Sequence, residues 1–390
     1  ALSLANSEGA ALVLDCSGSS LNGQPGDSGI IFVAQASVPA PGRGTGVATG
    51  GNPWSVSAPK MPPQATLGTE DYDRIVRLCR QGVKVRMAAN LQVEYTSDDT
   101  NSYNTIAEIP GTDLKDQIVM IGAHMDSWHS GTGATDNGAG VGCVMEAVRI
   151  LTALHLQPRR TIRVALWSGE EQGLLGSAAY VREHFAGAAA GGGRGGRGRG
   201  AGAGPADPAT EAATALAPAA PATPAARGPE WEKLSCYFNL DNGGGRIRGI
   251  YGMGNEAAGP LFKKWFEPFA DLGAHTVTLG MNGQTDHVSF DNAGLPGFGF
   301  IQDNLDYLTR THHSSADVYD RLQTEDMKVS STVMAAFLWD AANMDERFPR
   351  KPVAPAGGRG GPGGGRGGRG ASGAGGGGAD QPAQTAPAGG

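Results

Sequence analysis

The sequence predicts an α/β fold in which a mostly parallel or mixed central sheet is flanked by helices, preceded by a smaller module rich in strands. From Tyr103 onward, short apolar runs alternate with segments of helical periodicity. These runs are continuously apolar, which is typical of strands that helices cover on both faces. A sheet of this kind brings the carboxyl ends of its strands to one edge, where binding sites form.

The first hundred residues are expected to form the strand-rich module. Apolar runs bounded by Gly, Ser and Asp predict strands at residues 9–15 and 30–34. Thr69 is a candidate cap for a helix that Gly82 ends. The pattern after that helix predicts a long strand at residues 83–96.

Residues 101–353 are expected to form the main domain. Its first strand is the apolar run 117–123, followed by a helix over 140–156 with Val144, Met145 and Leu151 on one face. The later elements, in order, are a strand at 161–167, a helix at 174–185, strands at 235–240 and 247–251, a helix at 256–272, strands at 276–279 and 298–301, and a helix at 325–344.

Two segments have a composition that cannot form a core. Residues 186–228 are an insertion in the main domain and residues 354–390 are a tail, and together they hold 28 of the 63 glycines. Both are dominated by Gly, Ala, Pro and Arg, so they offer little apolar surface to offset the entropy of ordering. Both are therefore predicted to be disordered.

The charge and the apolar pattern argue against two classes of partner. Outside the two low-complexity segments, 24 basic residues stand against 35 acidic ones. Nucleic acid is not expected as a partner, because a phosphate backbone is held by clusters of Lys and Arg. The longest apolar runs are only a few residues, so no membrane-spanning segment is expected.

The four cysteines, Cys16, Cys79, Cys143 and Cys236, stand far apart with no CxxC pair. This spacing excludes a disulfide-dense scaffold and a thiolate zinc site. Four buried thiols are expected, and a Cys16–Cys79 disulfide stays open for an exported protein. The chain begins at Ala1 without a basic and apolar leader, which indicates a processed chain or a fragment.

Five short segments place carboxylates or imidazoles directly after predicted strands or in polar loops. Singly, each has a simple structural interpretation, since an Asp before Asn-Gly can cap a helix and adjacent acids can be a solvated pair. Together, several carboxylates at one sheet edge would repel one another unless a cation neutralised them. Imidazoles with carboxylates and no thiolate suit zinc. The segments are His124-Met125-Asp126, Thr135-Asp136-Asn137, Glu170-Glu171, Asp241-Asn242 and His312-His313 with Asp317.

With these motifs in this order, residues 103 to about 349 resemble the co-catalytic zinc exopeptidases, metallopeptidase family twenty-eight. Within the family the sequence is most similar to the carboxypeptidase Q branch, and it is also similar to bacterial leucyl aminopeptidases. Residues 1–100 resemble part of the protease-associated-like module inserted in that branch. The resemblance implies two zinc ions per chain, with a metal ligand set of His124, Asp136, Glu171, Asp241 and His313.

The resemblance also implies a role for each side chain. Asp136 would bridge the two ions, Glu170 would act as general base, and Asp126 would orient His124. His313 is preferred over His312 as the ligand because the family's ligand stands four residues before an Asp. Segments 285–287 and 303–307 also resemble parts of the family near the substrate cleft, although polar loop residues with local hydrogen bonds are an equal interpretation.

The implied activity is hydrolysis of peptide bonds next to a free terminus, by an aminopeptidase or dipeptidase using a metal-bridging hydroxide. A carboxypeptidase of the same family stays open, as does the oligomeric state. A single-zinc glutaminyl cyclase-like acyltransferase is disfavoured because His124 and Asp241 are both present. A metal-free receptor-like ectodomain is disfavoured by the intact ligand set and Glu170. The resemblance implies a secreted or periplasmic protein.

Overall fold

The computed structural model describes residues 2–16, 30–33, 36, 38, 53, 58, 60–94, 98–186, 227–283 and 285–352. The chain divides into two units, Ala1–Val353 and Ala354–Gly390. The predicted disorder of the insertion and of the tail falls on residues outside this description, except for the ends of the insertion. The predicted division of the rest into a module at 1–100 and a main domain at 101–353 stays a prediction.

A central sheet organises the first unit. Its strands run in the order β3-β5-β4-β6-β9-β7-β8. The neighbours β5/β4, β4/β6, β6/β9 and β7/β8 are parallel, whereas β3/β5 and β7/β9 are antiparallel. The sheet is thus mixed and mostly parallel. The bounds are β3 Thr105–Ile109, β4 Leu114–His124, β5 Arg160–Trp167, β6 Leu234–Asn239, β7 Ile247–Tyr251, β8 Thr276–Thr278 and β9 Gly297–Gln302.

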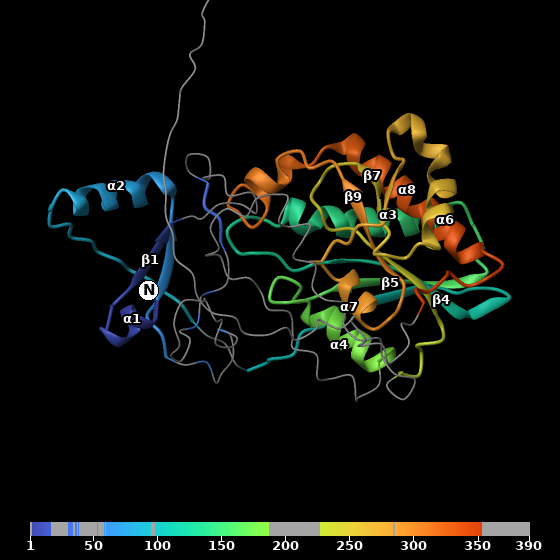
Figure 1. Cartoon of the computed structure of the whole chain (residues 1–390), viewed down its shortest axis with the longest axis horizontal. Coiled ribbons are helices and arrows are strands. Elements are labelled where there is room, and N and C mark those ends of the chain that lie inside the picture. The colour runs from blue at the N-terminus through green and yellow to red at the C-terminus, as the bar shows by residue number, and fades with distance from the viewer. Residues whose placement is uncertain are drawn as a thin grey trace, which may run out of the picture. The chain divides into compact units, whose positions relative to one another are not determined.

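Helices cover both faces of this sheet, as Figure 1 shows. On one side lie α3 (Ala139–Ala153), α6 (Ala258–Phe266) and α8 (Thr324–Asn343), and on the other lie α4 (Leu175–His184) and α7 (His287–Asn292). Strand β4 is buried on both faces, which explains its continuous apolar run. Val119 and Ile121 pack in the core with the first group of helices, whereas Ile118 and Met120 pack in the core with the second. Successive strand residues point to opposite faces, so a strand buried on both sides must be apolar throughout.

The larger of the two cores is rich in aromatic rings. Phe337 of α8 is fully buried and lies against Phe238 of β6, Phe262 of α6 and Phe300 of β9, with ring centroids 5.3–6.0 Å apart. Such pairs add to the free energy of burying the rings. They fix α6 and α8 on the sheet and leave the carboxyl edge of the strands free to carry polar side chains.

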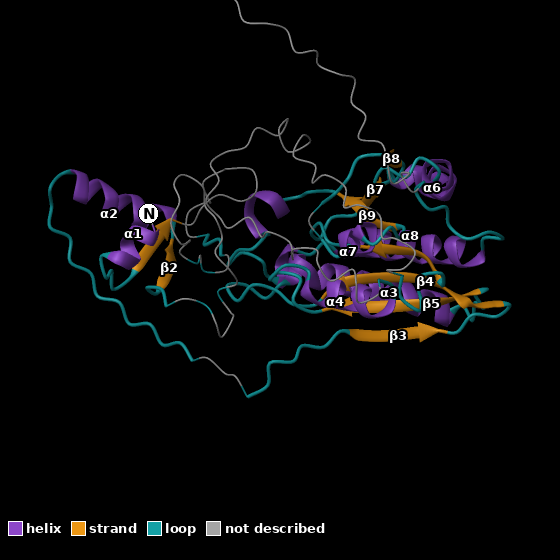
Figure 2. Cartoon of the chain, turned by 60° about the horizontal axis from the view of Figure 1, so that its bottom comes forward, coloured by secondary structure: helices purple, strands orange, loops and turns teal. Residues whose placement is uncertain are grey.

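Most of the predicted elements of the main domain are present, and the differences have local causes. The sequence does not predict strand β3 or helix α7, because both are short. Figure 2 shows β3 at one edge of the sheet, and most of its residues are exposed. The helix expected at 256–272 ends at Phe266 and continues as a 3-10 turn, since Pro268 has no N–H to donate. Met145 was wrongly expected on the buried face of α3; it is 58% exposed, and the smaller Cys143 and Ala147 are buried instead.

The N-terminal residues differ more from expectation. They form α1 (Leu2–Ser7), β1 (Val13–Cys16), β2 (Gln64–Leu67) and α2 (Thr69–Arg80), with β1 parallel to β2. Helix α2 has Gly68 as its cap, so the capping role predicted for Thr69 is wrong. The strand expected at 30–34 is reduced to a single bridge at Phe32.

The long strand predicted at 83–96 is also wrong over its described part. Residues 83–94 have no regular structure, and Val83, Met87 and Val93 are exposed. Apolar alternation favours a strand only where a neighbouring strand takes up its hydrogen bonds. No described strand pairs with this segment.

The burial of the four cysteines agrees with expectation in part. Cys143 and Cys236 are buried, but Cys16 is half-buried and Cys79 is exposed, so the expectation of four buried thiols holds for two of them. Among the described residues, no helix is both long enough and apolar enough to cross a membrane.

Candidate functional site

The ends of three neighbouring parallel strands bring the predicted site residues together. In the register of the sheet, His124 of β4 lies beside Trp167 of β5, and Gly122 of β4 lies beside Asn239 of β6. The loop after Trp167 carries Glu170 and Glu171, and the loop after Asn239 carries Asp241. The turn before α3 and the loop before α8 add the remaining side chains. Residues far apart in the sequence thus meet at one sheet edge, as the sequence predicts.

His124 lies at the centre of the cluster and is 1% exposed. Its Nε2 is 3.1 Å from Asp241 Oδ1 and 3.3 Å from Asp136 Oδ1. Its Nδ1 lies 2.9 Å from the main-chain oxygen of Asp126. Because that carbonyl can only accept, it receives the Nδ1 proton, and Nε2 faces two carboxylate oxygens whose negative charge a shared proton or a cation offsets. Nε2 is therefore placed to bind a cation.

Asp126 contacts His124 differently from the expectation. The orienting bond comes from its main-chain carbonyl, whereas its carboxylate oxygen lies 3.6 Å from His124 Nδ1. The carboxylate instead accepts the backbone N–H groups of Glu170 at 3.1 Å and Glu171 at 3.2 Å. Asp126 thus links the loop that carries the two glutamates to the end of β4.

Asp136 lies between two imidazoles. It belongs to the π-helical turn η1 (Ala134–Gly138), with Oδ1 near His124 and Oδ2 3.4 Å from His313 Nε2. Although its burial alone raises the pKa of Asp136, the hydrogen bond to His124 and the nearby histidine charges hold that pKa well below its usual range. Helix α3 has Gly138 as its cap, with no side-chain capping bond, so Asp136 is not a helix cap.

Asp317 holds the turn that carries Asp136. Its buried carboxylate accepts the backbone N–H of Thr135 at 2.6 Å, the hydroxyl of Thr135 at 2.8 Å and the backbone N–H of Asp136 at 3.1 Å. In the sequence, the four-residue spacing from His313 to Asp317 only distinguishes His313 from His312. The structure supplies a physical reason for it, because one loop both presents an imidazole and fixes the turn opposite.

The distances favour His313 over His312 as the second imidazole of the cluster. His313 Nε2 lies 3.0 Å from Glu171 Oε2 and 3.4 Å from Asp136 Oδ2, whereas His312 Nε2 is 3.9 Å from Asp136 Oδ2. His312 stacks on His313 and packs against the ring of Tyr307. Burial, together with the neighbouring His313, lowers the pKa of His312 to about 4. His312 is therefore kept neutral and behaves as a packing partner.

Glu170 and Glu171 are adjacent in the chain and both are held in a low-dielectric environment. Burial raises the pKa of Glu170 well above its ordinary value, and the charges of Asp241 and Glu171 act in the same direction. Burial, with the charge of Asp136, raises the pKa of Glu171 to about 7. Raised carboxyl pKa values at a cluster of acids are expected where positive charge is needed to complete the site.

The donor set fits divalent metal ions. Asp136 Oδ2 and Glu171 Oε1 are buried and have no hydrogen-bond partner among the described residues. In each of three sets of residues, the donor atoms lie within 4.8 Å of one another. Asp136 belongs to two of these sets, and so does His124. Imidazole nitrogens and carboxylate oxygens without thiolates are ligands typical of zinc. The three sets are Asp136 with His312 and His313, His124 with Asp136 and Glu171, and His124 with Glu170 and Asp241.

The two further segments, 285–287 and 303–307, differ in how their side chains relate to the cluster. Asp286 is fully buried, neither of its carboxylate oxygens has a described partner, and burial raises its pKa to about 7. Tyr307 is buried against His312. Asp303, in contrast, pairs with Arg248 at 2.6 Å, with both side chains about one-third exposed. Asp286 and Tyr307 thus adjoin the cluster, whereas Asp303 forms a structural ion pair with Arg248.

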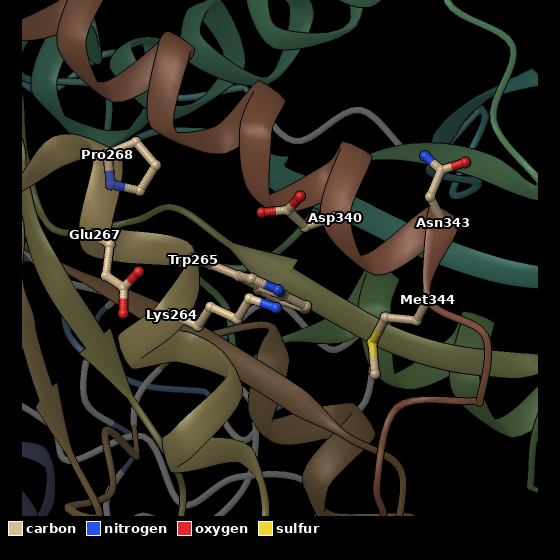
Figure 3. A pocket seen from close by; sticks show the side chains of 7 residues that line it. All are labelled: Lys264, Trp265, Glu267, Pro268, Asp340, Asn343 and Met344. Carbon is tan, nitrogen blue, oxygen red and sulfur yellow. The ribbon is translucent and has the colours of Figure 1, made fainter.

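A separate pocket of about 410 Å³ lies between α6 and α8. Trp265, Lys264 and Asp340 are among the side chains around it in Figure 3. None of its lining residues belongs to the cluster at the sheet edge, so the pocket is separate from that cluster.

Comparison with known proteins supports the family assignment. A model of peptidase family M28 matches residues 104–338. Carboxypeptidase Q of Mus musculus is 27% identical over 303 residues, which cover 77% of this chain and 54% of that protein. Leupeptin-inactivating enzyme 1 of Streptomyces exfoliatus is 27% identical over 264 residues, covering 63% of this chain and 50% of that protein. The chain thus spans about half the length of these curated relatives.

A solved structure supports the fold. A peptidase M28 precursor from Shewanella amazonensis matches with a TM-score of 0.59 and 24% sequence identity, covering 90% of this chain and 64% of that one. The predicted α/β fold and the predicted resemblance to this peptidase family are confirmed.

Proposed function

Because the chain belongs to peptidase family M28, we propose that it is a zinc-dependent exopeptidase that cleaves the peptide bond next to a free terminus. One observation carries the proposal. The Asp136 carboxylate lies between His124 and His313, with one oxygen near each imidazole. Such a carboxylate is suited to bridge two cations, each of which also binds one of the histidines.

The proposal assigns five side chains as metal ligands. His124, Asp136 and Asp241 would hold one zinc ion. Asp136, Glu171 and His313 would hold the other. Bound zinc supplies a Lewis acid for the scissile carbonyl and a water acidified to near neutral pH. The main-chain carbonyl of Asp126 keeps His124 in the tautomer that binds metal.

Glu170 is the proposed general base. It is no ligand in this assignment, yet one of its carboxylate oxygens lies within 4.8 Å of donor atoms of His124 and Asp241. It takes a proton from the attacking water as the oxygen adds to the carbonyl carbon. It then delivers this proton to the amine nitrogen as the carbon–nitrogen bond breaks, so the proton count balances. The raised pKa of Glu170 suits a group that must both accept and return a proton.

The proposed substrates are short peptides with a free terminus, and an aminopeptidase or dipeptidase is the favoured form. The named relatives include a carboxypeptidase and an enzyme that inactivates leupeptin, so both termini have to be tested. Incubation with a peptide library, read by mass spectrometry, shows which end is shortened. A secreted or periplasmic location stays a prediction.

Glu170→Gln tests the mechanism directly. The amide has the shape of the carboxylate but cannot accept the proton, so kcat should fall by about a hundred- to ten-thousandfold. Zinc content, measured by plasma emission, should stay at two per chain. Near wild-type activity in this variant would remove Glu170 from the mechanism. One zinc or none in the wild-type protein would contradict the two-metal site itself.

A further inference from the structure

Residues 30–33 lie beside the loop that presents His313. The Val33 N–H donates to the main-chain oxygen of His313 at 2.7 Å, and the Ser315 N–H donates to the main-chain oxygen of Ile31 at 2.9 Å. The Ile31 N–H donates to Ser315 Oγ at 3.1 Å. Phe32, which is buried, forms an antiparallel bridge with Ser314. A segment about 280 residues away in the chain thus binds the backbone of His313 and of the two residues that follow it.

The backbone conformation of His313 is one that such hydrogen bonds can stabilise. Its φ of 55° lies in the left-handed region, which residues other than glycine seldom adopt. A backbone in this region persists where its surroundings determine it. On the side of the main domain, the hydroxyl of Ser314 donates to the Arg310 carbonyl, and Asp317 binds Thr135. Residues 30–33 supply further hydrogen bonds to the same short loop.

The left-handed turn sets where the imidazole lies. With this backbone, His313 Nε2 reaches Glu171 at 3.0 Å and Asp136 at 3.4 Å. A relaxed loop would change the direction of the Cα–Cβ bond and therefore the position of the ring. Metal affinity depends on such groups behind a ligand, and their loss typically costs about ten- to a hundredfold.

We propose that residues 30–33 are a positioning segment for the metal site, which holds His313 in the geometry that binds a metal ion. The proposal rests on the proposed function, because it requires His313 to be a metal ligand. It assigns the segment to one of the two metal sites: the His313 site depends on it, and the site built on His124 and Asp241 does not.

Val33→Pro removes the N–H that binds the His313 carbonyl. The preceding residue, Phe32, is in a β-bridge, which agrees with the extended backbone that a proline favours in the residue before it. Val33→Ala keeps the N–H and is the matched control. Val13→Pro is the second control, since it removes a comparable N–H bond, to the Pro63 carbonyl at 2.9 Å, in β1.

The measurement is a calorimetric zinc titration of the full-length apoprotein, together with the visible spectrum on titration with Co²⁺. We expect Val33→Pro to bind one metal as tightly as wild type and the other about ten- to a hundredfold more weakly. Val33→Ala and Val13→Pro should retain both affinities. Ser315→Ala, which removes the acceptor of the Ile31 N–H, should weaken the same site, and Ser315→Thr should restore it.

Two results would overturn the inference. If Val33→Pro and Ser315→Ala each bind two metals as tightly as wild type, the segment positions nothing. If Val13→Pro weakens the same site to the same degree, the effect is a general loss of stability. If Val33→Pro does not fold, the Ser315 pair decides the matter alone. A wild-type protein with fewer than two metal sites would refute the proposed function, a result distinct from both.

Discussion

Asp317→Ala should destabilise the protein strongly, even without metal. The Asp317 carboxylate is 4% exposed and accepts the backbone N–H groups of Thr135 and Asp136, both of which are buried. Removing the acceptor leaves these two buried backbone donors unsatisfied, whereas the Thr135 hydroxyl, which the carboxylate also accepts, keeps Thr311 as a partner. At about 1–3 kcal/mol for each unsatisfied group, the free energy of unfolding should fall by about 2–6 kcal/mol. This is a large part of the stability of an ordinary domain.

A graded substitution keeps the test informative if Asp317→Ala does not fold. Asp317→Asn keeps one carbonyl oxygen for Thr135 but turns an NH₂ group towards the Asp136 N–H. It should cost about 1–3 kcal/mol, the penalty of one lost bond. Asp345→Ala is the control, because that side chain is 98% exposed and bonds only to a surface arginine among the contacts described.

The assay is urea unfolding in the presence of a chelator, followed by far-ultraviolet circular dichroism. The chelator separates backbone stabilisation from metal binding. A stability effect shifts the midpoint and leaves the slope unchanged. If Asp317→Ala unfolds at the same urea concentration as Asp345→Ala, Asp317 does not hold the Asp136 turn, and the account of the His313–Asp317 spacing is wrong.

Three more predictions concern the bridging ligand, the insertion and the core. Asp136→Ala removes a ligand from both proposed metal sites, so calorimetric titration should show that it loses more zinc than His124→Ala, which should keep one ion; two tightly bound ions in Asp136→Ala would exclude the bridge. Replacing residues 187–226 with a short Gly/Ser linker should leave zinc binding unchanged and the free energy of unfolding within about 1 kcal/mol. The reason is that Ala186 and Arg227 already form a bridge that brings the ends of the insertion together. A larger loss of stability would show that the insertion packs on the rest of the protein. Phe337→Ala should cost about 3–5 kcal/mol in chemical denaturation, since its ring is fully buried among other aromatic rings.

Local sequence patterns predicted most of the strands and helices of residues 101–353 and placed the acids and imidazoles of the candidate site after strands or in loops. Strand β4 is apolar at every position from Ile118 to Ala123, and that run alone predicts a strand covered on both faces. His124 follows it directly, and Glu170 and Asp241 lie three and two residues after the ends of β5 and β6. Because parallel strands place their carboxyl ends at one edge, these positions already imply that the side chains meet.

Only the tertiary structure decided which segments distant in the chain touch one another. It placed the main-chain carbonyl of Asp126 2.9 Å from His124 Nδ1, with the carboxylate at 3.6 Å, and it showed that Asp317 holds the turn of Asp136. It also placed residues 30–33 against the His313 loop and left residues 83–94 without a partner strand. The physical reason is that propensity and periodicity act over a few neighbouring residues. A hydrogen bond between distant segments depends instead on how the whole chain packs, which no local pattern records.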